Sequence, residues 1–256
     1  MTGMDHSTTP QISTVVAVTG AGTGIGRATA RAFAAQGAHV LAVGRRTEPL
    51  EETADGHDRI VPLAADITAD GEPGRIVGTA LEMYGRLDVL VNNAGIVHSG
   101  ALGTLTPQTI VSQTATNLIA PVLLAQAALP SLEASGGVIV NVSTSVGQRA
   151  WPGSSVYAAT KTALETLTRS WAVELAPRGV RVVAVAPGAI DTPIGEHQGL
   201  TPERTAAVRR WQLAHTPLGR IGRPQEVAWA ITRLAAPAAS FITGVVLPVD
   251  GGAVVA

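Results

Sequence analysis

Short apolar runs rich in valine alternate along the chain with longer segments in which apolar residues recur every three or four positions. Runs of four to six apolar residues are typical of strands that are buried on both faces, and the longer periodicity is typical of helices. Strands that alternate with helices form βαβ units, which build a parallel sheet. The pattern predicts seven strands, within residues 13–20, 38–44, 59–66, 87–95, 137–145, 180–188 and 244–252.

The segments between these strands carry the helical periodicity. The fold class that follows is α/β, with a doubly wound, Rossmann-like parallel sheet of seven strands and helices on both faces. The predicted helices cover residues 25–36, 48–53, 75–84, 109–132, 156–176 and 225–234.

One domain accounts for the whole pattern. The chain has 256 residues, a length that large α/β domains reach undivided, and it contains no internal repeat, low-complexity linker or shift in composition. We expect a polar N-terminal tail at residues 1–12 and a single dinucleotide-binding and catalytic domain at 13–256. The least regular region, 193–217, follows the sixth strand, at the sheet edge where ligands bind in open α/β sheets. We interpret it as a substrate lid, with an ordinary surface insertion as the alternative.

Composition narrows the class of protein further. The net charge is −1 without a long basic run, which argues against nucleic acid as a partner. The chain has no cysteine, which excludes disulfides, thiolate metal sites and a cysteine nucleophile and is compatible with a reducing compartment. The N-terminal segment is polar. The sequence has no stretch of about 18 uninterrupted apolar residues, the length that would predict a membrane span. We therefore expect a cytoplasmic protein with no membrane partner.

A glycine-rich segment joins the first predicted strand to the first predicted helix. It reads T-G-A-G-T-G-I-G from Thr19 to Gly26. Backbone N–H groups and the helix dipole attract a pyrophosphate at such a position, and glycines let the cofactor approach the backbone. The spacing is T-G-x-x-x-G-x-G and differs from the G-x-G-x-x-G fingerprint. The segment predicts a dinucleotide site, with a glycine-rich turn that binds no ligand as the alternative.

The end of the second strand is expected to set the cofactor preference. An acidic residue there binds the ribose 2′-hydroxyl of NAD, whereas an arginine accepts the 2′-phosphate of NADP. Here Gly44 is followed by Arg45 and Arg46, whose guanidinium groups suit bidentate contact with phosphate. We therefore expect NADP(H) to be favoured over NAD(H). Two solvated arginines at the start of a helix are the alternative.

Tyr157 and Lys161 stand four residues apart at the start of a predicted helix, so their side chains share one face. A phenol with a pKa of about 10 transfers protons poorly at neutral pH, and a nearby ammonium favours its anion. Ser143, Thr144 and Ser145 end the fifth strand, and a hydroxyl from this segment would hold a substrate carbonyl oxygen as negative charge develops on it. A bound nicotinamide would supply the hydride, and Tyr157 the proton.

The order and spacing of several motifs resemble the short-chain dehydrogenase/reductase family, in its single-domain form with the Tyr-x-x-x-Lys signature. The resemblance extends from about residue 15 to 251, nearly the whole chain. Besides the glycine segment and Y-x-x-x-K, the matching motifs are Asp66, N-N-A-G at 92–95, Asn117, S-T-S at 143–145, P-G-A-I-D-T-P at 187–193, L-G-R-I-G-R-P-Q-E-V-A at 218–228 and I-T-G-V-V-L-P-V-D-G-G at 242–252.

The resemblance implies four catalytic residues, Asn117, Thr144, Tyr157 and Lys161. Tyr157 would be the acid or base, and Lys161 would lower its pKa and bind the nicotinamide ribose. Asn117 would hold a water that joins the lysine to solvent. The family's serine stands thirteen residues before its tyrosine, and this position is Thr144 here. Threonine offers the same hydroxyl with a stiffer side chain, and either neighbouring serine could serve instead if the strand ended one residue differently.

Cofactor contacts are implied in the same way. Asp66 and Ile67 would flank the adenine, and Asn92 and Ala94 would line the adenosine side. Ile190 and Thr192 would hold the carboxamide. The cofactor-binding set is Gly20, Thr23, Gly24, Ile25, Gly26, Arg45, Arg46, Asp66, Ile67, Asn93, Ala94, Gly95, Tyr157, Lys161, Pro187, Gly188, Ile190 and Thr192.

Further side chains were weighed as ligands or contacts. His197 and His215 show no metal-ligand spacing with a third partner, so no metal is expected. Trp151, His98 and Trp211 are as consistent with packing or surface as with substrate contact. The run 118–129 is apolar nearly all round, and the C-terminal segment 245–256 is short and apolar. Both are consistent with a subunit interface and equally with burial inside one subunit. The resemblance implies a homo-oligomer, a tetramer or a dimer.

These features predict an NAD(P)-dependent oxidoreductase whose substrate is a small molecule. It would interconvert a ketone or aldehyde and the corresponding alcohol. The alternative from another class is a non-catalytic cofactor-binding or regulatory protein of the same fold, which the threonine at position 144 alone favours. Among enzymes, a 3-oxoacyl-thioester reductase, a steroid or secondary-alcohol dehydrogenase and a sugar-alcohol dehydrogenase stay open. Arg204, Arg209 and Arg210 are consistent with an anionic substrate or carrier and equally with a solvated helix face.

Overall fold

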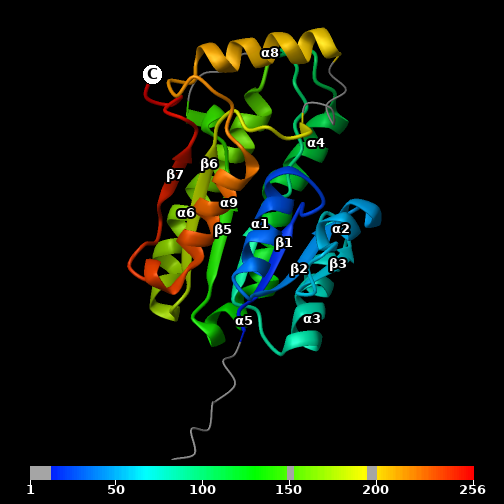
Figure 1. Cartoon of the computed structure of the whole chain (residues 1–256), viewed down its shortest axis with the longest axis vertical. Helices are drawn as coiled ribbons and strands as arrows, with labels where there is room; N and C mark the ends of the chain where they lie inside the picture. The colour runs from blue at the N-terminus through cyan, green and yellow to red at the C-terminus, as the bar shows by residue number, and fades with distance from the viewer. Residues whose placement is uncertain (1–12, 149–152, 195–200) are drawn as a thin grey trace, which may run out of the picture.

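A single parallel sheet forms the centre of the molecule (Figure 1). The computed structural model describes residues 13–148, 153–194 and 201–256, so the predicted tail 1–12 and part of the predicted lid lie outside the described residues. The strand order is β3-β2-β1-β4-β5-β6-β7, which confirms the predicted seven-stranded, Rossmann-like fold. The strands are β1 (Val15–Thr19), β2 (His39–Gly44), β3 (Ile60–Ala64), β4 (Val89–Asn92), β5 (Val138–Val142), β6 (Arg181–Pro187) and β7 (Val246–Val249).

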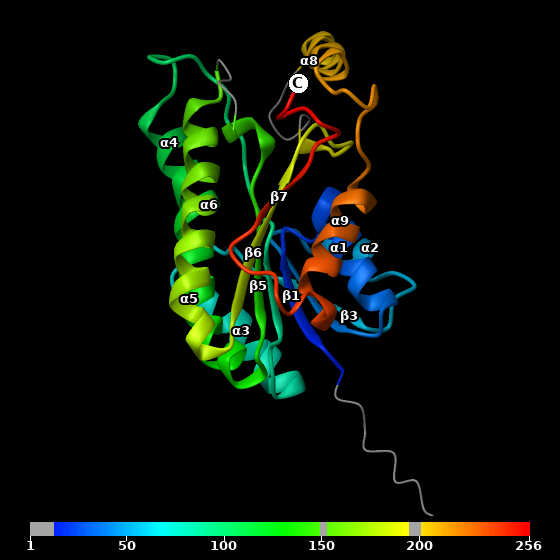
Figure 2. The ribbon, with the colours of Figure 1, turned by 90° about the vertical axis from the view of Figure 1, so that its left-hand side faces the viewer.

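Helices cover both faces of the sheet (Figure 2). Helices α1, α2 and α9 lie on one side of it, and α3, α5 and α6 on the other. Every predicted helix is present. The helices are α1 (Gly24–Ala35), α2 (Thr47–Ala54), α3 (Glu72–Tyr84), α4 (Pro107–Thr114), α5 (Ala120–Ser135), α6 (Ser155–Leu175), α8 (Pro202–Ala214) and α9 (Pro224–Ala235), with short turns η1 (Ala115–Ile119), η2 (Ser145–Gln148), η3 (Ala176–Arg178) and η4 (Pro237–Ala239).

Alternate residues of each strand contribute to two separate hydrophobic cores, one on each face of the sheet. Val16 and Val18 pack with α1 and α9, whereas Val15 and Ala17 of the same strand pack with α3 and α5. All four side chains are buried, because side chains of a strand alternate between the two faces of a sheet. This double burial explains why the strands read as continuous apolar runs.

The carboxyl ends of β1 and β4 meet where the winding of the chain reverses. β1 lies between β2 and β4, so the loops that follow β1 and β4 leave the sheet in opposite directions. Such a switch point opens a crevice at the carboxyl edge of the sheet, and ligands of open α/β folds bind there. Here both loops come from the motifs T-G-x-x-x-G-x-G and N-N-A-G.

The predicted helix 109–132 is one part of a longer helical stretch, Pro107–Ser135. A π-helical turn, η1, interrupts its α-helical geometry and joins α4 to α5. Within the described residues, this 29-residue stretch is the one that length and composition would allow to cross a membrane, a test that core helices of soluble proteins also pass. Leu124, Ala128 and Leu132 of α5 are fully buried against the sheet and α3, so this helix belongs to the core.

The region expected to be least regular contains a regular helix. α8 spans Pro202–Ala214 and lies across the end of the molecule toward which the strands run (Figure 1). The side chain of Thr201 accepts a hydrogen bond from the N–H of Arg204, and Pro202 occupies the first turn. Threonine followed by proline was a readable helix start, so the expectation of irregular structure is wrong for these residues.

Candidate active site

The glycine loop between β1 and α1 has a conformation that only glycine adopts without strain. Gly20 has φ +66° and Gly24 has φ +52°, both in the left-handed region. A Cβ atom at Gly26 would lie 2.1 Å from the carbonyl oxygen of Gly20. The loop therefore closes on the start of α1 at a distance that a side chain would prevent.

The first turn of α1 keeps its N–H groups available. Thr23 precedes the helix without capping it by a side-chain hydrogen bond, and no acidic residue stands in the first turn. The initial N–H groups of a helix have no partner within it and attract an anion. Because Thr23, Gly24 and Ile25 line the cavity described below, these donors fit the pyrophosphate of a dinucleotide.

The segment after β4 braces the glycine loop. The amide nitrogen Nδ2 of Asn93 donates to the carbonyl oxygens of Thr19 and Gly20, at 2.8 and 3.2 Å. The hydroxyl of Thr19 accepts from the backbone N–H of Asn93 and of Ala94, both at 3.1 Å. Residues of N-N-A-G thus fix the loop in addition to lining the cavity.

Asn92 does not take part in the cavity. Its side chain is 2% exposed, and Nδ2 donates to Oδ1 of Asn141 on β5 at 3.0 Å. Asn141 in turn donates to Thr168 on α6 at 2.9 Å. The expectation that Asn92 lines the adenosine side is therefore wrong, since its side chain points into the interior between two paired strands.

Tyr157 and Thr144 face each other across the carboxyl edge of the sheet. Tyr157 lies on the first turn of α6, Thr144 follows β5, and their hydroxyls share a hydrogen bond. The Thr144 hydroxyl also makes a long contact of 3.4 Å with the carbonyl oxygen of Pro187. Of the three candidate hydroxyls, the structure brings Thr144 to the tyrosine.

The neighbouring serines are directed elsewhere. The Ser143 hydroxyl donates to the carboxylate of Glu165, a buried residue of α6, at 2.7 Å. Ser145 begins the turn η2 and is buried. The strand therefore ends in the register that presents Thr144.

Lys161 is buried one helical turn beyond Tyr157. Its Nζ donates to the carbonyl oxygen of Val142 at 2.7 Å, and the side chain is 3% exposed. Burial disfavours the charged ammonium and lowers the pKa of Lys161 to about 8. The lysine is thus still mostly protonated at neutral pH.

Burial acts in the opposite direction on the phenol. It raises the pKa of Tyr157, and the hydrogen bond with Thr144 counteracts part of this rise. This direction is opposite to the one expected from Lys161, because burial dominates the pKa of Tyr157 in the protein alone. Tyr157 is consequently a protonated group at neutral pH, in the state of a proton donor.

Asn117 lies in the π-helical turn η1 and is fully buried. Its Oδ1 accepts from the N–H of Ile96 and its Nδ2 donates to the carbonyl oxygen of Ile96, each at 2.9 Å. A Cβ atom at Gly95 would lie 3.3 Å from Lys161 Nζ and 3.4 Å from Asn117 Oδ1. Asn117 therefore holds the segment after β4 in place, next to the lysine.

One cavity of about 690 Å³ gathers most of the predicted residues. It is lined by every residue of the predicted cofactor set except the four near β2 and β3. Three of the four predicted catalytic residues also line it; the fourth, Asn117, is buried outside it. From the two predicted sets it is lined by Gly20, Thr23, Gly24, Ile25, Gly26, Asn93, Ala94, Gly95, Thr144, Tyr157, Lys161, Pro187, Gly188, Ile190 and Thr192.

The four remaining residues stand beyond this cavity, at the ends of β2 and β3. Arg45 and Arg46 are exposed, and Ile67 is buried. The carboxylate of Asp66 accepts hydrogen bonds from the hydroxyl and the N–H of Thr68, at 2.7 and 3.0 Å, which lower the pKa of Asp66, and the charge of Arg45 adds to the effect. Arg45 and Asp66 are therefore near neighbours at the edge expected to receive the adenosine end.

The opposite wall of the cavity comes from the region that was interpreted as a substrate lid, although its helix was not expected. α8 contributes Arg204, Thr205, Ala207, Val208, Arg209 and Gln212. Residues four apart on a helix share a face, so Arg204, Val208 and Gln212 form one row along it. This spacing was readable in the sequence, but it did not show which of these side chains would line the cavity.

The other side chains considered as metal ligands or substrate contacts do not line the cavity in the described part of the chain. Trp211 and His215 stack on each other outside the cavity, with ring centroids 3.8 Å apart, and His98 is not among its lining residues. Trp151 and His197 lie outside the described residues. Among those that are described, no group of three or more His, Asp or Glu side chains has an arrangement that could hold a metal ion.

The fold and the cavity together define a dinucleotide-binding protein of the doubly wound α/β class. Residues 20–254 match a family model described as Enoyl-(Acyl carrier protein) reductase. The chain is 39% identical over 246 residues to the 3-oxoacyl-[acyl-carrier-protein] reductase FabG of Thermotoga maritima, a match that covers 94% of this chain and 98% of that protein. It is 41% identical over 244 residues to the cis-4-hydroxycyclohexanecarboxylate dehydrogenase of Sinomonas cyclohexanicum, covering 93% and 95%.

A solved structure agrees with these sequence matches. The 3-ketoacyl-(acyl-carrier-protein) reductase of Brucella melitensis, complexed with NADH, superposes with a TM-score of 0.88 at 34% identity, over 94% of this chain and 98% of that one. The chain belongs to the short-chain dehydrogenase/reductase family. It is an NAD(P)-dependent oxidoreductase, as predicted, and none of these relatives favours the non-catalytic alternative.

Proposed function

We propose that this protein is an NADP(H)-preferring enzyme that reduces a ketone or aldehyde of small molecular size to an alcohol, or catalyses the reverse reaction. The observation that carries the proposal is the meeting of the Tyr157 and Thr144 hydroxyls in the cavity that Lys161 and the glycine loop also line. Tyr157 is the acid or base, Thr144 orients the carbonyl, and Lys161 and Asn117 support the proton transfer. These roles require Tyr157, Thr144 and Lys161 to surround one cavity at the carboxyl edge of the sheet.

A bound nicotinamide supplies or accepts the hydride. For reduction, Tyr157 donates its proton to the carbonyl oxygen, and its burial keeps that proton in place at neutral pH. The weak 3.4 Å contact of Thr144 with Pro187 allows its hydroxyl to turn and donate to the same oxygen as negative charge grows there. The ammonium of Lys161 stabilises the tyrosinate that remains.

Two substrate types follow from the relatives, a 3-oxoacyl thioester and a secondary alcohol or its ketone. A panel of ketones, aldehydes and 3-oxoacyl thioesters, assayed with NADPH, tests the proposal. Turnover of at least one carbonyl compound is expected. Saturable cofactor binding without turnover of any compound would instead support a non-catalytic protein.

The cofactor preference rests on the end of β2. Gly44 offers no carboxylate there, and Arg45 and Arg46 follow it as exposed side chains without an ion pair among the residues described. We expect NADPH to bind about 10- to 100-fold more tightly than NADH in a fluorescence titration, because two guanidinium groups contact the 2′-phosphate.

A double variant isolates this contact. Arg45→Ala with Arg46→Ala should lose the preference for NADPH and leave NADH binding unchanged, whereas Arg59→Ala, which removes an exposed arginine that contacts His39 elsewhere, should keep it. Equal or tighter binding of NADH by the unaltered protein would show that the two arginines are solvated surface residues.

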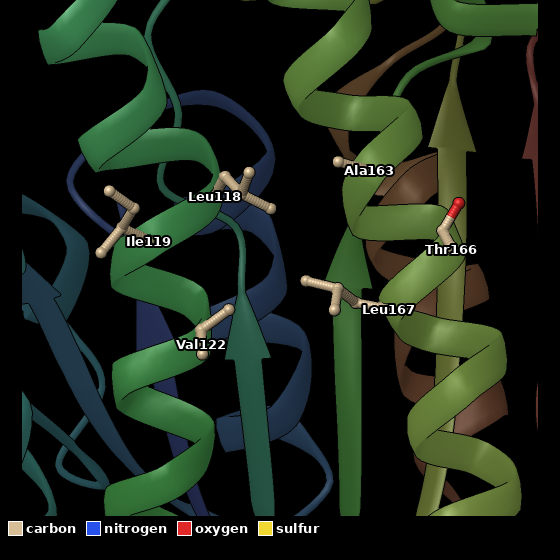
Figure 3. Close-up of a pocket in the computed structure, with 6 residues that line it drawn as sticks. All are labelled: Leu118, Ile119, Val122, Ala163, Thr166 and Leu167. Atoms are coloured by element: carbon tan, nitrogen blue, oxygen red, sulfur yellow. The ribbon is translucent and has the colours of Figure 1, made fainter.

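We further propose that the protein forms a homo-oligomer through α5 and α6. An apolar groove separates two helical segments (Figure 3). One side is formed by η1 and the start of α5, and the other by the middle of α6. The groove is lined by Leu118, Ile119, Val122, Ala163, Thr166 and Leu167. Ile119 is 49% exposed, and Leu123 next to it is 44% exposed. A second copy that packs the same helices here would bury this surface, as a two-fold interface requires.

The oligomer proposal predicts that Val122→Glu weakens assembly. A buried carboxylate without a partner destabilises an apolar interface, so the particle mass from light scattering should fall by a factor of two. Met83→Glu is the matched control, since Met83 is exposed on α3, away from the groove. A monomeric unaltered protein, or a Val122→Glu variant with unchanged mass, would contradict the interface.

The cytoplasm is the proposed location. A chain of 256 residues without a single cysteine carries no disulfide that an oxidising compartment would supply, and it suits a reducing one.

A further inference from the structure

The charged side chains that line the cavity are all cationic. Its lining includes Lys161, Arg204 and Arg209 and no aspartate or glutamate. Lys161 lies deep in the cavity beside the tyrosine, whereas both arginines come from α8. A region that contains cations without carboxylates favours a ligand with negative charge.

The two arginines of α8 differ in their partners. The guanidinium of Arg209 contacts Oδ1 of Asp191 at 2.5 Å, an ion pair that ties α8 to the segment after β6. No carboxylate within the described part of the chain pairs with Arg204. Among the described residues, the charge of Arg204 is therefore the one on this wall that no ion pair compensates.

The nearest carboxylate in the sequence, that of Glu203, has hydrogen-bond partners other than Arg204. Glu203 is held at the start of α8 by hydrogen bonds with its own backbone N–H and with Thr201, which lower the pKa of Glu203. The backbone N–H of Arg204 donates to the hydroxyl of Thr201, so the cap fixes where its side chain begins. Arg204 thus has a defined position on a capped helix.

We infer that Arg204 recognises an anionic group, a carboxylate or an anion of similar geometry, on the substrate. The inference rests on the proposed function, which places the carbonyl at Tyr157 and Thr144. The rest of the substrate then extends along the wall that α8 forms, past Val208, to a guanidinium that can bind a carboxylate in a bidentate manner. Arg204 is accordingly a specificity-determining residue, and the substrate class is that of oxo acids or hydroxy acids.

Matched pairs of oxo acids and their esters test this assignment. The probes are 3-oxobutanoate, 4-oxopentanoate and 4-oxocyclohexanecarboxylate, each compared with its ethyl ester, which has the same carbonyl but no charge. For at least one pair, kcat/KM of the unaltered protein should be about 10- to 100-fold higher for the acid, the range of a charged hydrogen bond. Arg204→Gln should abolish this preference while leaving kcat/KM for the ester and the dissociation constant of NADPH unchanged.

Arg210→Gln is the control, because Arg210 is adjacent on α8 but does not line the cavity, and it should retain the preference. Turnover of the esters without preference for any acid would overturn the inference and leave the proposed function standing. Weaker NADPH binding by Arg204→Gln, with equal losses for acid and ester, would assign Arg204 to the cofactor instead. Absence of turnover with every probe and with the wider carbonyl panel would contradict the proposed function as well.

Discussion

Replacing Tyr157 by Phe should lower kcat for carbonyl reduction by about 1000-fold, the contribution of a positioned general acid. The substitution removes one oxygen and keeps the ring that fills the start of α6. The hydride donor and the Thr144 hydroxyl stay in place, but the group proposed to protonate the carbonyl oxygen is removed. NADPH binding should be unchanged, since Lys161 and the glycine loop are retained. Oxidation of NADPH, followed by its absorbance, measures kcat, and a fluorescence titration measures the binding.

Tyr84→Phe provides a matched control, because the chain has two tyrosines and Tyr84 stacks on His39 outside the cavity. It should behave as the unaltered protein does. Full activity of the Tyr157→Phe variant would show that another group transfers the proton. A loss of NADPH binding equal to the loss of activity would assign Tyr157 to the cofactor rather than to the acid.

Gly26→Ala is expected to weaken NADPH binding by about 100-fold, equivalent to roughly 3 kcal/mol. The added methyl would lie 2.1 Å from the carbonyl oxygen of Gly20 and 2.5 Å from Nδ2 of Asn93. One of these two atoms belongs to a backbone carbonyl and the other to the side-chain amide that braces it, so the loop must move away from the start of α1. The N–H groups proposed to bind the pyrophosphate then lose their common orientation. The free energy of unfolding should also fall, by about 1–3 kcal/mol.

Gly78→Ala distinguishes this steric effect from the general effect of replacing a glycine. Gly78 lies within α3, and an added Cβ there would meet no atom within 4 Å. Alanine has the higher helix propensity, so this variant should be more stable by about 0.5–1 kcal/mol and bind NADPH normally. Normal NADPH binding by Gly26→Ala would contradict the assignment of the loop to the cofactor.

The strands and most helices were predictable because each is specified by its own residues. Double burial requires apolar residues at every position of a strand, and amphipathic helices repeat their apolar face, so both patterns are local. The glycine loop and the pair Tyr157 and Lys161 were readable for the same reason, since one helix or one turn holds each of them. The approach of Thr144 to Tyr157 needed the family spacing as well.

Features that depend on neighbours distant in sequence were not predictable. The side chain of Asn92 turns inward because Asn92 pairs with Asn141 in the register between β4 and β5, and a single strand does not reveal its register. The π-helical turn around Asn117 leaves the apolar pattern of the helix nearly intact. Burial decided the direction of the pKa shift of Tyr157, and neither this burial nor the side chains that α8 turns toward the cavity can be deduced from spacing along the chain.

The interior position of β1 in the sheet affects how the chain folds as it is synthesised. β1, β2 and β3 are made first and can pair with one another, but the other edge of β1 pairs with β4, where Val16 lies opposite Val89. About 70 residues separate the end of β1 from the start of β4. Until β4 has been made, this apolar edge has no partner strand, and an unpaired edge invites association with other chains. Only pairings between strands distant in sequence complete the sheet, so its assembly is intrinsically slow. We expect nascent chains that end before β4 to depend on chaperones to stay soluble.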